Sequence, residues 1–237
     1  MKYAVKVLAI LCLWTIPSFA NDIYITQSGD DLDLDIVQDG TDNVIGNSVT
    51  AVSLTGDDMT FDIKQTGNSN VITAIIKGAT YTGDWDITGD NNEIDLLCSS
   101  TATGSCDTVT LTVAATGDDN DFTINIGETS DSDSATVAFT VTGDNNIIDS
   151  TLNGKNANIT VALNNSASLS TNSANSDEGV AVTLDVSGDG DSAGHTVDLD
   201  ITGGGGTVDV TQSGIHDNTV DLTIAGDDFD VDITQSD

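Results

Sequence analysis

The stretch LDLDIVQDGTDNVI, residues 32–45, contains the two features that decide the fold. Apolar and polar side chains alternate in its first half, and Gly, Asp and Asn are concentrated in its second half. Alternation with a period of two is typical of a β-strand with one buried face. Gly, Asn and Asp favour tight turns because they tolerate positive φ. The stretch therefore predicts a short strand followed by a turn.

The phrase Gln-x-Gly recurs along the chain, often with Asn three residues after the glycine. Over much of the sequence the glycine positions are 11 residues apart, which indicates one structural unit built repeatedly. Insertions rich in Ser, Asp and Asn, near residues 98–106, 127–134 and 166–179, explain longer steps. The complete phrases begin at Gln27, Gln38, Gln65 and Gln212.

Each unit has room for a strand and a turn, but one strand cannot bury its inward face by itself. Two successive units folded face to face make one coil, and stacked coils pair each strand with neighbours about 4.8 Å away. Helical spacing is absent after the N-terminal segment. The sequence therefore predicts an all-β fold, a β-solenoid of strand-turn-strand-turn coils with about 11 residues per unit and roughly eight coils.

The first twenty residues combine two lysines, a short apolar stretch and a Ser-Phe-Ala end. This pattern predicts a cleaved secretory signal peptide at 1–20. Residues 21–237 are expected to form a single β-solenoid domain. The apolar stretch is too short for a membrane span, and nothing later resembles one. The mature protein is therefore expected to be secreted, and to be extracellular or on the cell surface.

The composition argues against nucleic-acid binding and favours a disulfide bond. The formal net charge of −34 excludes nucleic acid as a partner. Cys98 and Cys106 are the two cysteines that remain after signal removal, and they bracket a short loop. In an exported protein a local disulfide is the favoured state, and two free buried thiols are the alternative.

A longer pattern, Gln-x-Gly-x-x-Asn-x-Ile, runs from Gln38 to Ile45 and from Gln65 to Ile72, and the step from Gln27 to Gln38 is 11 residues. This pattern resembles the repeat of curlins, the subunits of bacterial curli amyloid fibres. The resemblance implies a stacked solenoid, secretion through an outer-membrane pore, and head-to-tail growth into an extracellular fibre of biofilms, with a nucleator as a further partner.

The chain departs from the curlin pattern in its charge, its longer loops and its inward positions. Aliphatic residues stand where the family tends to place Gln, at Ile76, Ile87, Val141, Leu152, Leu163, Val186 and Ile201.

Identical amides stacked at strand spacing hydrogen-bond along the stack, so the recurring Gln and Asn residues are expected to form ladders that support assembly. The expected ladder residues are Gln27, Gln38, Gln65, Gln212, Gln235, Asn43, Asn70, Asn92, Asn120 and Asn146.

The ends of the solenoid carry no recognisable capping element in the sequence, and both contain Ile-Thr-Gln-Ser. One hypothesis is that Gln235 continues its ladder onto Gln27 or Gln38 of the next subunit, depending on strand parity. The alternative is that both ends are ordinary terminal coils that fray.

Gly-Asp-Asp and Gly-Asp-Asn turns offer carboxylate and carbonyl oxygens, the ligands that Ca²⁺ takes. Calcium is therefore a candidate cofactor, although Asp and Asn are also simply good turn formers. Outward aspartates repeated in every coil would repel one another, so saline surroundings or bound divalent cations are expected. The candidate calcium residues are Asp30, Asp31, Asp57, Asp58, Asp118, Asp119, Asp227 and Asp228.

Catalysis is not expected, because His195 and His216 are isolated and suit surface or turn positions, and arginine is absent. The favoured function is a structural subunit that stacks end to end into extracellular filaments. The rival is a monomeric, calcium-dependent β-solenoid adhesin or surface-binding module. Ice binding would need repeated rungs of outward Thr-x-Thr, and one short example at residues 108–112 is too little.

Overall fold

A computed structural model describes residues 22–40, 42–98, 106–127, 134–143, 145–154, 156–164, 180–187, 194–203, 205–214, 218–226 and 229–236. In these residues the chain forms nineteen β-strands and no helix. The expected signal peptide at 1–20 and most of the three expected insertions lie outside the described residues.

The strands alternate along the chain between two sheets, here called the first and the second sheet. The first sheet contains β1 (Asp22–Ile23), β2 (Thr26–Ser28), β4 (Val44–Ile45), β5 (Val52–Thr55), β7 (Val71–Lys77), β9 (Glu93–Cys98), β11 (Asp121–Ile126), β13 (Ile147–Asn153), β15 (Val180–Ser187), β17 (Gly206–Ser213) and β19 (Phe229–Ser236). The second sheet contains β3 (Asp33–Asp39), β6 (Met59–Thr66), β8 (Thr80–Thr88), β10 (Thr108–Thr116), β12 (Ser134–Thr142), β14 (Ala157–Asn164), β16 (Thr196–Thr202) and β18 (Thr219–Ala225).

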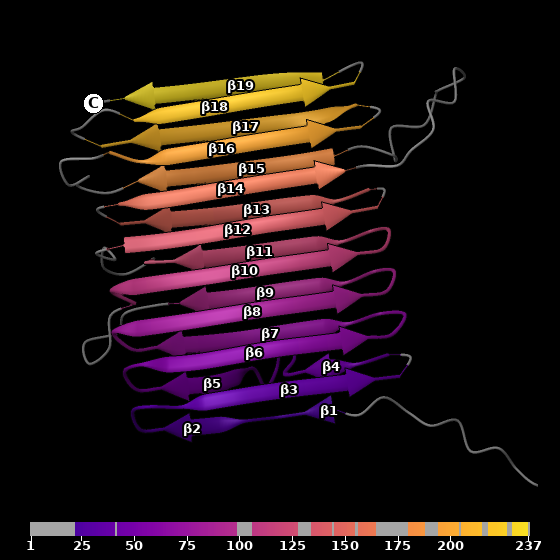
Figure 1. Cartoon of the computed structure of the whole chain (residues 1–237), viewed down its shortest axis with the longest axis vertical. Helices are drawn as coiled ribbons and strands as arrows, with labels where there is room; N and C mark the ends of the chain where they lie inside the picture. The colour runs from indigo at the N-terminus through magenta and orange to yellow at the C-terminus, as the bar shows by residue number, and fades with distance from the viewer. Residues whose placement is uncertain are drawn as a thin grey trace, which may run out of the picture.

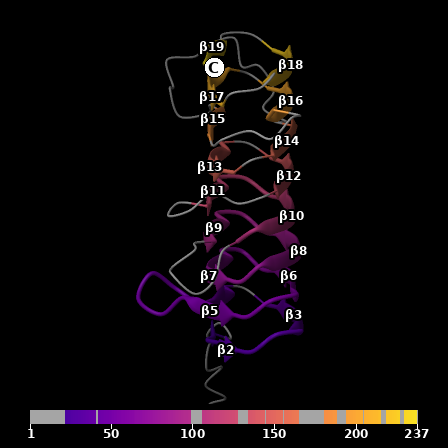
Figure 2. The same cartoon turned by 90° about the vertical axis from the view of Figure 1, so that its left-hand side faces the viewer.

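Within each sheet the strands pair in parallel with their counterparts one coil away, as between β10 and β12 or β11 and β13. The stack grows in one direction from β1 and β2 to β19 (Figure 1). Seen from the side, the two sheets form two facing columns joined by turns (Figure 2). The prediction of an all-β solenoid is confirmed, and the predicted number of about eight coils is close to the eight strands of the second sheet.

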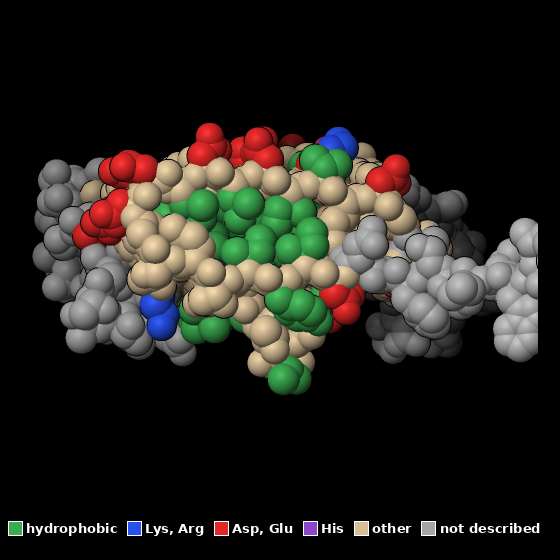
Figure 3. All heavy atoms as spheres, turned by 90° about the horizontal axis from the view of Figure 1, so that it is seen from below, with side chains coloured by type: hydrophobic (Ala, Val, Ile, Leu, Met, Phe, Trp, Pro, Cys, Tyr) green, Lys and Arg blue, Asp and Glu red, His purple; other side chains and the backbone are tan. Residues whose placement is uncertain are grey.

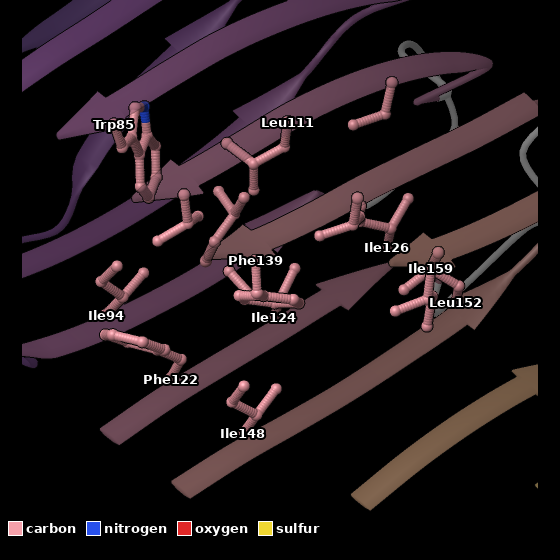
Figure 4. Packing of buried hydrophobic residues seen from close by; sticks show 14 of the residues in the cluster. Trp85, Ile94, Leu111, Phe122, Ile124, Ile126, Phe139, Ile148, Leu152 and Ile159 are labelled. Carbon is pink, nitrogen blue, oxygen red and sulfur yellow. The ribbon is translucent and has the colours of Figure 1, made fainter. Parts of the chain in front are cut away.

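The core lies between the two sheets and follows from the alternation of side chains. In β10, for example, Val109, Leu111 and Val113 are buried while the threonines between them are exposed. Phe122 from the first sheet and Phe139 from the second stack with ring centroids 6.2 Å apart. Figure 4 shows these rings among aliphatic side chains from both sheets. Because the apolar area is buried on one face of each strand, the alternation predicts which residues form the core.

One irregular step in the repeat comes from an excursion that the sequence analysis missed. Ile45 pairs with Ile72 and Val52 pairs with Ala74, so residues 46–51 lie opposite Thr73 alone. The excursion projects beside β5 (Figure 2). The only signal in the sequence is the 16-residue step between Gly40 and Gly56.

Cys98 and Cys106 are joined by a disulfide, with their Cα atoms 5.9 Å apart. A loop this short should stabilise the fold by about 2–3 kcal/mol. We expect reductant to lower the free energy of unfolding by that amount, measured by urea titration. In the matched control, the double variant Cys98→Ala with Cys106→Ala, reductant should have no effect. Equal sensitivity of both proteins would contradict the assignment.

Candidate functional site: side-chain ladders and the two ends of the solenoid

Glutamines on inward strand faces stack near both ends of the solenoid. In the second sheet, Gln65 Nε2 donates to Gln38 Oε1 over 2.8 Å. In the first sheet, Gln235 Nε2 donates to Gln212 Oε1 over 2.9 Å. Gln27 lies in the same column as Gln235, but its neighbour one coil up is Leu54. Gln27 therefore belongs to no glutamine ladder within the molecule.

The columns between these glutamines are aliphatic. The column above Gln65 begins with Ile87, and the column below Gln212 begins with Val186. All seven aliphatic residues that the sequence analysis placed at glutamine positions lie in these two columns: Ile76, Ile87, Val141, Leu152, Leu163, Val186 and Ile201. The polar pairs thus lie near the ends of the stack, and the middle excludes water.

An asparagine ladder runs through five successive turns that lead from the second sheet to the first. The Nδ2 of each of the first four asparagines donates to the Oδ1 of the asparagine one coil up, over 3.2, 2.8, 2.7 and 2.6 Å. The same amides also donate to backbone carbonyls of the turns, as Asn43 does to Thr66. Buried polar groups are costly unless hydrogen-bonded, so this ladder fixes the register of neighbouring coils. Its members are Asn43, Asn70, Asn92, Asn120 and Asn146.

The turn residues explain why Gly, Asp and Asn recur. Asp31, Asp58 and Asp119 adopt positive φ of 59°, 55° and 56°, a region that Asp and Asn tolerate better than most residues. A Cβ on Gly56 would lie 1.9 Å from the carbonyl oxygen of Gly29, so the stacked turns require glycine there.

Several of the candidate calcium carboxylates form hydrogen bonds between coils. Asp30 Oδ1 accepts from the N–H of Asp57 over 3.0 Å, and Asp57 Oδ1 accepts from the N–H of Ala79 over 2.8 Å. Asp119 Oδ1 accepts from Asn145 Nδ2 over 3.0 Å. These contacts give the turn aspartates a structural role that needs no metal.

The candidate calcium residues do not gather in one place. Asp30, Asp31, Asp57 and Asp58 lie in turns that lead from the first sheet to the second, whereas Asp118 and Asp119 lie in a turn that leads back. Asp227 and Asp228 are outside the described residues. Across the described part of the chain, no three His, Cys, Asp or Glu side chains are grouped as a metal site would need.

Calcium binding remains a hypothesis that a titration can test. Because Asp30, Asp57 and Asp119 already accept hydrogen bonds, we expect calcium and magnesium at equal ionic strength to change the light scattering of the protein equally, by screening alone. Light scattering during each titration measures this. A response to calcium at least tenfold stronger than to magnesium would show specific sites.

One column on the outer face of the first sheet alternates acids with threonines over five coils. Asp95, Thr123, Asp149, Thr183 and Asp209 succeed one another in one column, so that a threonine stands between carboxylates. Acids also stack directly, as in the pairs Asp35 with Asp62, Asp198 with Asp221, and Asp209 with Asp232, the last of which continues the same column. The expected repetition of outward aspartates in every coil therefore holds only in parts of the surface.

Asp121 on β11 is one acid whose ionisation the fold opposes. Partial burial, and next the charge of Asp149, raise the pKa of Asp121 above its ordinary value. The folded chain therefore binds this proton more tightly than the unfolded chain does. The resulting stabilisation is present at low pH and is lost as the pH rises through the folded-state pKa.

We expect Asp121→Asn to raise the melting temperature at neutral pH, measured by circular dichroism. The gain should vanish below the ordinary pKa of aspartate, where Asp121 is protonated in both the folded and the unfolded chain. Asp185→Asn, which removes an exposed charge from β15, is the matched control and should change the melting temperature less. A gain that is independent of pH would contradict this account.

The two ends of the stack leave inward-facing side chains uncovered by the described residues. Figure 3 shows an apolar patch in the middle of the end that carries β1 and β2. At the other end Ile233 is 43% exposed, although it lies on the inward face of β19. The partly buried residues are Ile23, Ile25, Leu32 and Leu34 at the first end, and Val220, Leu222, Ile224, Phe229 and Val231 at the second.

Each end also presents strands paired on one side only. Within the described residues, β18 ends the second sheet beyond β16, and β19 ends the first sheet beyond β17. Unpaired N–H and C=O groups at such edges are a template for pairing with another chain. Exposed core residues next to unpaired strands define a surface suited to strand addition.

His195, which was expected at a surface or turn position, is buried. Its Nδ1 accepts the N–H of Ala157 over 3.2 Å, and its own N–H donates to Asn218 Oδ1 over 3.1 Å. The residue thus ties neighbouring coils of the second sheet together. His216 lies outside the described residues.

Comparison of the chain with protein-family models, with curated proteins and with solved structures finds no match to any of them. In the described ranges, none of the elements is an apolar helix of membrane-spanning length.

Proposed function

We propose that this chain is a secreted structural subunit that stacks end to end into extracellular filaments. The observation that carries the proposal is the pair of open ends. A parallel stack whose terminal strands and core side chains are left uncovered by the described residues gains buried apolar area and backbone hydrogen bonds when a second copy continues it.

The glutamine ladders also support end-to-end stacking. Gln235 at one end and Gln38 near the other already take part in amide stacks inside the molecule. Stacks of this kind extend from chain to chain in cross-β assemblies. The Gln-x-Gly-x-x-Asn repeat resembles that of curlins. The proposal therefore includes an outer-membrane secretion pore and a nucleator as partners, and it places the filaments in a biofilm matrix or on the cell surface.

Electron microscopy and sedimentation of residues 21–237 test the proposal. We expect unbranched filaments that sediment with nearly all of the protein at high concentration. As a matched test, a chain that ends before Asp217, and so lacks β18 and β19, should elongate more slowly in light scattering. A full-length chain that stays monomeric at high concentration would favour the adhesin instead.

A further inference from the structure

The number of strand rows fixes how one molecule can follow another. In the described residues, β1 shares a row of the first sheet with β2, and β4 shares one with β5. The first sheet therefore has nine rows and the second sheet has eight. Among the described residues, the first and the last row both belong to the first sheet, so the number of described rows is odd.

An odd number of rows makes simple translation an incomplete joint. If the next molecule followed in the same orientation, β1 and β2 would pair with β19, and Gln27 would lie on Gln235. The second sheet would then lack one row between β18 and β3 of the next molecule. That gap would leave the facing backbone edges of both strands unpaired, which is costly in a buried position.

We propose that successive molecules are instead related by a half turn about the filament axis, in addition to the ordinary twist of the sheets. This inference rests on the proposed function. A half turn places the first sheet of the next molecule above the second sheet of this one, and its second sheet above the first. The strands still run in the same direction in each column, because the chain runs in opposite directions through the two sheets. The row after β19 is then β3 of the next molecule, and the row after β18 is formed by its β1 and β2. No row is missing.

The sequence of the two ends fits this joint. Residues 226–235 read GDDFDVDITQ, and residues 29–38 read GDDLDLDIVQ, so the sequence that leads into and through β19 repeats the sequence that leads into and through β3. The half-turn joint aligns these two segments residue by residue. Gln235 then lies beside Gln38, and Ile233 beside Ile36.

Most inward-facing residues also match across the joint, and Gln27 lies beside the aliphatic Ile224, as it lies beside Leu54 within the molecule. Val231 lies beside Leu34, while Leu222 and Val220 lie beside Ile25 and Ile23. The ladder direction continues as well, since each glutamine of the higher coil donates to the one below, as Gln65 does to Gln38. Of the two possible partners of Gln235, which are Gln27 and Gln38, the half-turn joint selects Gln38.

The half-turn joint also aligns acids. On the outer face, Asp230 lies beside Asp33 and Asp232 beside Asp35. Like charges at this spacing repel, and salt screens the repulsion. Assembly is therefore expected to be faster as ionic strength rises.

Cross-linking of mixed filaments tests the joint. Variants of residues 21–237 that keep the Cys98–Cys106 disulfide and carry one added cysteine are prepared at four exposed outward positions: Thr234→Cys, Val37→Cys, Thr26→Cys and Thr223→Cys. Two variants are mixed, assembled, and treated with a bismaleimide shorter than the roughly 10 Å between stacked sheets. Denaturing electrophoresis measures the dimer, and each variant assembled by itself is the control.

The half turn places position 234 beside 37, and 223 beside 26, on opposite outer faces of the filament. We expect both of these pairs to give at least tenfold more dimer than the pair 234 with 26. The reverse order of yields, in filaments that form normally, would overturn the half turn and leave the proposed function standing. Normal filaments without dimer from any pair would also overturn it. If sedimentation shows no polymer, the proposed function itself fails.

Discussion

Replacing Ile233 by aspartate should slow filament elongation at least tenfold without unfolding the subunit. Ile233 faces inward on β19 yet is 43% exposed in the single molecule, so its replacement costs the isolated fold little. In a filament the same side chain becomes buried, and an unpaired carboxylate there costs several kcal/mol. Because about 1.4 kcal/mol corresponds to a factor of ten, the effect on the joint is large.

Thr234→Asp is the matched control for this prediction. It adds the same charge one residue away, on the outer face of β19, where water remains. Elongation is followed by light scattering, and folding of both variants by circular dichroism. Equal elongation rates for the two variants would show that the end of β19 is not buried during assembly.

Replacing Trp85 by alanine should lower the free energy of unfolding by about 3–5 kcal/mol. The indole is fully buried, packs edge to face on Phe61 with centroids 5.9 Å apart, and donates from Nε1 to the carbonyl of Phe61 over 2.9 Å. Alanine leaves a cavity between the two sheets, and the carbonyl of Phe61 loses its indole donor. Urea titration measures the loss as a lower midpoint.

Trp85→Phe serves as the comparison, because it keeps an aromatic ring in the core and removes the Nε1 donor. It should lose less stability than Trp85→Ala. A loss below about 1 kcal/mol for the alanine variant would mean that this part of the core is loosely packed in solution.

The fold could be predicted from the sequence because each strand is short, alternating and closed by its own turn. The alternation of side chains such as Leu34 and Ile36 predicts which face of the strand is buried. The 11-residue period predicts the length of one strand-turn unit. Ladder membership also follows from spacing, as the four bonds between successive asparagines show.

Features that depend on register between distant strands could not be predicted in the same way. Whether Gln235 faces Gln27 or Gln38 depends on the parity of the rows, and parity requires knowing that β4 and β5 share one row. The excursion at residues 46–51 separates β4 from β5, so the sequence does not indicate that the two strands share one row. The burial of His195 has a similar cause, because its contacts with Ala157 and Asn218 come from other coils.

The arrangement of surface charges could not be predicted from the sequence either. From composition, outward aspartates were expected to stack in every coil. The alternation of Asp95, Thr123 and Asp149 in one column appears only when the strands are placed in register. Loop lengths set that register, and they carry no periodic signal of their own.

X-ray fibre diffraction from aligned filaments of residues 21–237 tests most directly whether strand pairing passes from one molecule to the next. The account expects a sharp reflection near 4.8 Å along the fibre axis, with strands perpendicular to that axis. Filaments without an axial reflection at this spacing, or a protein that forms no filaments, would contradict it.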